Sequence, residues 1–119
     1  MKKLFLVAFA LLAVTLLPAQ DINLPSPVKP GGLTVMEALS KRQSTDNFKE
    51  TNLTDQQLSD LLWAANGINR ENGKRTAPSA LNSQDVNVYV ALASGVYKYD
   101  ATNLKLIFVS SADCRQLAQ

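Results

Sequence analysis

Two short stretches of this chain, Arg42-Gln43-Ser44 and Pro78-Ser79-Ala80-Leu81-Asn82-Ser83-Gln84, hold the residues that decide how it is interpreted. Arg42 and Ser44 lie on the same side of an extended backbone, because side chains alternate along such a chain. Together they offer a phosphate one bidentate guanidinium and one hydroxyl donor. Taken alone, Arg-x-Ser is a common pattern, and a solvent-exposed pair is its usual explanation.

The second stretch combines backbone amides with a side-chain amide. Pro78-Ser79 is expected to open a short helical turn through about Gln84, and free amides at a helix N-terminus suit an anion or a ring carbonyl. Asn82 can both donate and accept hydrogen bonds, as the polar edge of a pyrimidine-like ring requires. In isolation, Asn82 is also explained as an ordinary turn residue.

Two capping boxes predict where helices begin. Thr34 followed by Glu37 predicts a short helix to about Ser40, and Thr54 followed by Gln57 predicts a second one. Apolar residues at helical spacing continue the second helix, and Gly67 is expected to end it in a left-handed conformation. The apolar stripe of that helix consists of Leu58, Leu61, Leu62 and Ala65.

The sequence pattern of the second half of the chain predicts strands. Residues 86–92 alternate between valine or leucine and other residues, which predicts a strand with a buried face. A tight reversal at Ser94-Gly95 then leads into a second strand at 96–99, so a hairpin is expected. A third strand is predicted at 104–109, and Ser110 or Ser111 could cap a last helix.

The N-terminus has the pattern of a secretory signal peptide. Met1-Lys2-Lys3 is followed by an apolar run to Leu17, and cleavage is expected after Ala19. The run is shorter than the ~20 apolar residues that cross a bilayer, and no cysteine stands at the cleavage point for a lipid anchor. We therefore expect residues 1–19 to be a signal peptide, residues 20–33 an extended leader without a core of its own, and an ordered domain from residue 34. The protein is expected to be exported, to the periplasm in a bacterial context, with no stable membrane anchor.

Charge and composition narrow the classes of function. Of 12 basic residues, Lys2 and Lys3 leave with the signal peptide, and the remaining 10 balance 10 acidic ones. Nucleic-acid binding is not expected, since it depends on neutralising phosphates. Cys114 is the single cysteine and is either a buried small residue or an intermolecular handle. The chain has no histidine, so it lacks Ser-His and Cys-His nucleophile pairs and the commonest metal ligand. No metal site is expected, and an enzyme with this composition would need an organic cofactor.

The order of these features resembles the nitroreductase family. Arg-x-Ser follows a short helix, Phe48 comes after it, and the Leu61–Gly67 helix segment precedes Arg75-Thr76-Ala77-Pro78-Ser79 and a valine-rich strand. The similarity is to the branch related to thiazoline and oxazoline oxidases, in which Gly-Val-Tyr-x-Tyr-Asp, here residues 95–100, also tends to appear.

The resemblance implies an α+β fold, with a mostly antiparallel sheet flanked by helices, and a homodimer with FMN at the subunit interface. It implies hydride transfer from NAD(P)H through the flavin to a small-molecule electron acceptor such as a nitroaromatic compound or a quinone. No catalytic side chain is required by this chemistry. The residues that the resemblance assigns to the cofactor are Arg42 and Ser44 at the phosphate and ribityl chain, Lys41 as a further phosphate contact, and Pro78, Ser79 and Asn82 along the ring system.

The resemblance also predicts that the chain holds the N-terminal part of such a domain, residues 34–119. The family's later glycine-containing segment and C-terminal basic pair do not occur before Gln119. An alternative hypothesis is an exported non-enzymatic remnant or binding module that keeps the first half of the fold.

Overall fold

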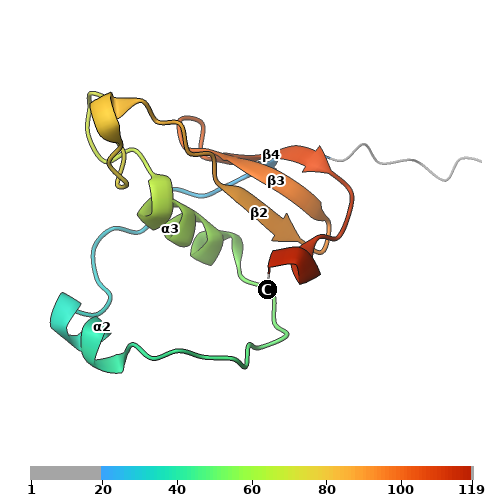
Figure 1. Ribbon diagram of the computed structural model, residues 1–119, viewed down its shortest axis with the longest axis horizontal. Coiled ribbons are helices and arrows are strands. Elements are labelled where there is room, and N and C mark those ends of the chain that lie inside the picture. Colours follow the sequence, from blue (N-terminus) through green and yellow to red (C-terminus); the bar gives the residue numbers. More distant parts are fainter. Residues whose placement is uncertain (1–19, 119) are drawn as a thin grey trace, which may run out of the picture.

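The computed structural model describes residues 20–118, and the predicted signal peptide lies outside them. Figure 1 shows a twisted sheet with one helix beside it and a second helix that stands apart from the sheet. The elements in chain order are β1 (Ile22–Asn23), α2 (Val35–Lys41), α3 (Asp55–Asn66), η1 (Ala80–Asn82), β2 (Tyr89–Leu92), β3 (Gly95–Asp100), β4 (Lys105–Ser110) and η2 (Arg115–Ala118). The predicted α+β class and the predominantly antiparallel sheet are confirmed. Within residues 20–118, no helix is long and apolar enough to span a membrane.

The sheet has four strands in the order β1-β4-β3-β2, and every neighbouring pair is antiparallel. The predicted hairpin joins β2 to β3 through a turn at Ala93-Ser94. Gly95, the first residue of β3, has φ +140°, and a Cβ there would lie 2.2 Å from the Ser110 carbonyl oxygen. Glycine therefore allows β3 and β4 to approach closely where the hairpin begins.

Helix α3 packs on one face of this sheet. Its buried residues Leu58 and Leu62 belong to one apolar cluster with Tyr97 and Tyr99 of β3 and Leu106 of β4. Leu106 is fully buried, which marks the centre of the core. The predicted stripe is confirmed for Leu58 and Leu62, whereas Leu61 is 58% exposed and Ala65 is exposed as well.

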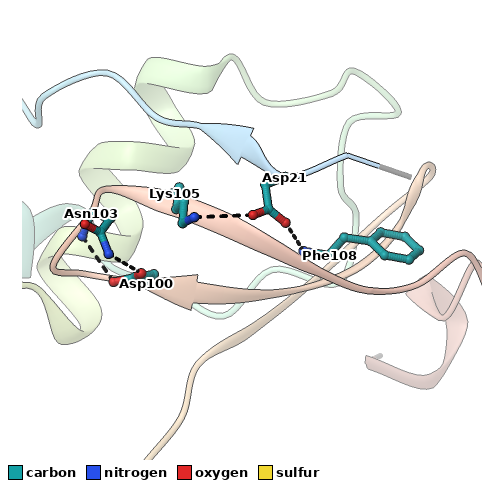
Figure 2. Close-up of polar contacts among 5 residues, drawn as sticks. All are labelled: Asp21, Asp100, Asn103, Lys105 and Phe108. Atoms are coloured by element: carbon teal, nitrogen blue, oxygen red, sulfur yellow. Dashed lines mark hydrogen bonds and ion pairs between the residues drawn. The ribbon is translucent and has the colours of Figure 1, made fainter. Parts of the chain in front are cut away.

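Packed structure begins at Ile22 rather than at Thr34. Ile22 pairs with Leu106 at the edge of the sheet, and Leu24 is buried in the core. Asp21 fixes the entry to this strand: its carboxylate accepts from the Phe108 amide at 2.9 Å and from Lys105 Nζ at 3.3 Å (Figure 2). These bonds, the one from Phe108 above all, hold the pKa of Asp21 below its usual range. The sequence did not indicate this role because two residues are too few for a recognisable strand pattern.

After Leu24 the chain crosses α3. The buried Ser59 hydroxyl donates to the Pro25 carbonyl at 2.5 Å, and the Val28 amide donates to Asp60 Oδ1 at 2.7 Å. The first part of the predicted leader is therefore tied to both layers of the domain.

Both predicted capping boxes are present, at Thr34 and at Thr54. The expectation for Gly67 is wrong: it ends α3 with φ −76° and ψ 161°, which is extended backbone and not left-handed. A Cβ at this position would lie 2.3 Å from Trp63 Cδ1. Gly67 is thus explained by the close approach of the Trp63 ring. The last predicted helix is a short 3-10 segment, η2, and Cys114 just before it is half-buried.

Candidate functional site

The loop from Pro78 to Gln84 has an uncommon backbone conformation. Leu81, Asn82 and Gln84 have φ values of 53°, 55° and 53°, in the left-handed region that costs residues with a Cβ about 1–2 kcal/mol each. The Gln84 amide donates to Ser79 Oγ at 3.0 Å and closes the loop. Such conformations concentrate at ligand-binding sites, so the loop is a candidate functional site.

The Gln84 side chain holds this loop in place. Its Nε2 group donates to the Gly73 carbonyl at 3.2 Å and to Asn82 Oδ1 at 3.0 Å, and its Oε1 accepts from Arg75 Nε at 3.1 Å. Arg75 in turn donates from Nη1 to the Asn66 carbonyl, the last residue of α3, at 3.1 Å. The loop is thereby connected to the C-terminal end of α3 through two side chains.

These bonds determine what the loop offers to a ligand. Because Asn82 Oδ1 accepts from Gln84, the Nδ2 group of Asn82 remains as a donor, on an exposed side chain. Ser79 Oγ accepts from the Gln84 amide and keeps its hydroxyl hydrogen to donate. Pro78, Ser79 and Asn82 line one cavity of about 570 Å³. The structure therefore brings together the three residues predicted to lie along a ring system.

The other three predicted residues lie elsewhere. Lys41 is the last residue of α2, Arg42 is its C-cap in extended conformation, and Ser44 follows without regular structure. All three are exposed, and none of them lines the cavity beside Pro78. In Figure 1, α2 stands apart from the sheet and from the segment around residue 80. Within one chain, the predicted phosphate-binding and ring-binding residues form two separate groups.

Lys41, Arg42 and Ser44 belong to a segment, residues 28–53, in which every residue is exposed; we call it the arm. Its large apolar side chains are exposed as well: Val35 by 74%, Met36 by 75%, Leu39 by 59% and Phe48 by 84%. Val35, Met36 and Leu39 recur at helical spacing and form an apolar face of α2 without a partner among the described residues. A patch of this kind marks an interaction surface.

Arg75 and Gln84 were not among the predicted site residues. The available signal was their position: Arg75 precedes Pro78 closely, and Gln84 ends the stretch that contains Asn82. Their spacing in the sequence does not reveal that the Gln84 side chain forms hydrogen bonds with both Gly73 and Asn82. Burial raises the pKa of Tyr99, although the charge of Arg75 acts in the opposite direction. The Tyr99 hydroxyl has no hydrogen-bond partner among the described residues. Within residues 20–118, no group of three acidic or cysteine side chains gathers as metal ligands.

Comparison with known proteins gives consistent results. The model of the nitroreductase family matches residues 39–119. A protein of Methanocaldococcus jannaschii that carries the name putative nitroreductase is 36% identical over 69 residues, which cover 53% of this chain and 35% of that protein. The crystal structure of a protein with the same designation from Ralstonia eutropha superposes with a TM-score of 0.79 at 41% identity, over 84% of this chain and 49% of that one. The chain thus spans about half the length of the solved relative and about a third of the curated one.

Proposed function

The chain belongs to the nitroreductase family, and we propose from this membership that it acts as an FMN-dependent oxidoreductase. It would transfer hydride from NAD(P)H through flavin to nitroaromatic, quinone or similar small-molecule acceptors. The observation that carries the proposal is the loop at residues 78–84, whose conformation is fixed by hydrogen bonds of Gln84 before any ligand binds.

The donor set on this loop fits the flavin ring system. The carbonyl oxygens and ring nitrogens at the polar edge of an isoalloxazine accept hydrogen bonds. Asn82 and Ser79 both line the cavity, and each keeps a donor, Nδ2 of Asn82 and the hydroxyl of Ser79. Pro78 adds an apolar surface for a flat ring. These residues would orient the ring, and FMN when bound would supply the redox chemistry.

The arm fits the phosphate end of the cofactor. Arg42 is exposed, and among the described residues neither an ion pair nor a side-chain hydrogen bond occupies its guanidinium. Ser44 follows Arg42 by two residues, and Lys41 directly precedes Arg42. Two cations and a hydroxyl on one short segment match a dianionic phosphate.

The separation of these two groups supports a homodimer. If FMN lies at a subunit interface, Arg42 of the partner subunit would hold the phosphate of a cofactor whose ring contacts Asn82 and Ser79. The exposed apolar face of α2 would then be covered by the other subunit. One chain presents both halves of a site, and two chains are needed to complete it.

Export belongs to the same proposal. Cleavage after Ala19 would leave Gln20 and Asp21 ahead of β1, and Asp21 makes the first contacts of the described chain. The contacts of Asp21 with Lys105 and Phe108 therefore lie within the part of the chain that remains after the expected cut. Mass spectrometry of the protein recovered from a periplasmic fraction should give the mass of residues 20–119, and a mass that includes residues 1–19 would refute this cleavage site.

The first experiment is an absorption spectrum of the purified mature protein before and after addition of FMN and gel filtration. Flavin that stays with the dimer fraction, identified by its mass after release, would support the proposal. Loss of all flavin during filtration would refute FMN binding by this chain and favour the alternative of a non-enzymatic binding module.

A further inference from the structure

A second group of charged residues lies beside the loop at residues 78–84. Residues 68–75 form a tight hairpin, in which Ile68 bridges to Arg75, the Asn69 amide donates to the Lys74 carbonyl at 3.2 Å and the Gly73 amide donates to the Arg70 carbonyl at 3.0 Å. This turn, expected from the sequence only as a polar loop, brings three cationic residues to one end of the cavity.

The residues that line the cavity of about 570 Å³ include Arg70, Lys74 and Arg75 in addition to Pro78, Ser79 and Asn82. No aspartate or glutamate is among the described residues that line it. Ion pairs within residues 20–118 join Lys105 to Asp21 and Arg115 to Asp113, so none of the three cavity cations is neutralised by a described carboxylate. The cavity therefore carries an uncompensated positive charge.

Arg75 is fixed in advance of ligand binding. Its Nε and Nη1 groups donate to Gln84 and to the Asn66 carbonyl, and the residue is half-buried. A guanidinium has five N–H donors, so donors remain after these two bonds. A guanidinium held in place loses less entropy when it binds an oxyanion.

The same cavity has an apolar part. Leu81, which is fully exposed and has a positive φ, also lines the cavity. A ligand that fills both parts has a flat apolar body and an anionic group.

We propose that this cavity binds a small planar molecule bearing an oxyanion, a carboxylate or a phosphate, through Arg70, Lys74 and Arg75. The inference rests on the proposed function in one respect: the bound molecule would be the electron acceptor, placed against the ring that Asn82 and Ser79 orient. It narrows the acceptors from nitroaromatic compounds and quinones in general to their anionic members.

The test compares three probes of similar size: 4-nitrobenzoate, phenyl phosphate and the neutral 4-nitrobenzamide. Binding to the mature protein is followed by amide chemical shifts in residues 69–82, with and without FMN, so that the readout does not depend on turnover. We expect the anions to bind more tightly than the amide, by about fivefold or more, since each exposed charge pair contributes up to about fivefold in affinity and three cationic residues line the cavity. The tighter anion identifies the group that the site prefers.

Lys74→Gln and Arg70→Gln should each weaken binding of the preferred anion by about twofold to fivefold and leave 4-nitrobenzamide unchanged. Lys98→Gln, which removes the same charge outside the cavity, is the matched control and should change neither. Equal binding of anions and amide, or an equal effect of Lys98→Gln, would overturn the proposal. So would a loss of FMN affinity in Lys74→Gln and Arg70→Gln with unchanged anion binding, because the cations would then serve the cofactor. If the protein does not retain FMN, only the proposed function is refuted. The proposal for the anion site is still tested, because anion binding is also measured in the protein without FMN.

Discussion

The proposed FMN site combines Arg42 of one subunit with Asn82 of the other, which makes a specific prediction for mixed dimers. Arg42→Ala removes the phosphate contact from the arm, and Asn82→Ala removes the ring donor from the loop. In a dimer of one Arg42→Ala subunit and one Asn82→Ala subunit, one site carries both defects and the other carries neither. A site formed within a single chain would be defective in both subunits of the same mixture.

The magnitude follows from the contacts. A charge-assisted hydrogen bond contributes about 1.5–3 kcal/mol, so Arg42→Ala alone should weaken FMN binding about 10-fold to 100-fold. Arg42 is exposed and has no side-chain partner among the described residues, so its loss should leave folding unchanged. Random exchange makes about half of the dimers mixed, each with one intact site, so about a quarter of all sites should recover normal affinity.

The assay is a calorimetric titration with FMN of each variant alone and of the two after unfolding and refolding together. The mixture should show a tight class of sites that neither variant shows alone. Absence of that class, with dimers confirmed by sedimentation and with wild-type protein regaining FMN binding after the same refolding, would refute the shared site. Unchanged FMN affinity in Arg42→Ala would refute the role of Arg42 itself.

Three further predictions concern the arm, the end of α3 and a turn. Leu39→Asp should shift the dimer toward monomer in sedimentation without lowering the unfolding midpoint of the monomer, because Leu39 is exposed within the chain; a dimer of unchanged affinity would contradict the role of α2. Gly67→Ala should destabilise the fold by about 1–3 kcal/mol in urea unfolding, since its Cβ would overlap the Trp63 ring, and a neutral result would show that the ring moves aside. Asp100 accepts from the Asn103 side chain at 2.7 Å (Figure 2), and this bond above all lowers its pKa. Its stabilising contribution is therefore complete above the unfolded-state pKa and is lost as pH falls through the lower folded-state pKa. The free energy of unfolding should therefore fall less steeply toward acid pH in Asp100→Asn than in the wild type.

Local sequence signals predicted the helices well. Thr34 and Thr54 begin helices because each capping box satisfies backbone amides within one turn of chain. The hairpin around Gly95 was predicted for the same reason, since a tight reversal is set by a few neighbouring residues. Patterns of this kind need no knowledge of distant contacts.

Contacts between side chains and between strands explain what the sequence patterns did not reveal. Gly67 was predicted to be a left-handed cap, yet the absence of a Cβ is needed there because the Trp63 ring lies so close. The Nε1 group of Trp63 donates to the Ile68 carbonyl at 3.1 Å. Leu24 lies in a segment rich in proline, and its burial depends on pairing with a strand from the other end of the chain. For the candidate site, the sequence indicated Asn82 but not the side chain of Gln84 that directs it. Which donors of a residue stay free depends on its neighbours in space, and the sequence does not contain that information.

The exposed arm connects cofactor binding to assembly. Complete burial of an apolar side chain contributes about 1.5–3 kcal/mol. The four large apolar residues of the arm, Val35, Met36, Leu39 and Phe48, therefore contribute up to roughly 6–12 kcal/mol in each subunit, and the two arms of a symmetric dimer up to roughly 12–24 kcal/mol. Association costs about 4–15 kcal/mol in lost freedom of movement, so burial of both arms is large enough to offset this cost. A cofactor held by Arg42 of one subunit and Asn82 of the other would add contacts that exist only in the dimer. Because linkage is reciprocal, FMN would then strengthen the dimer by the same factor by which dimerisation strengthens FMN binding.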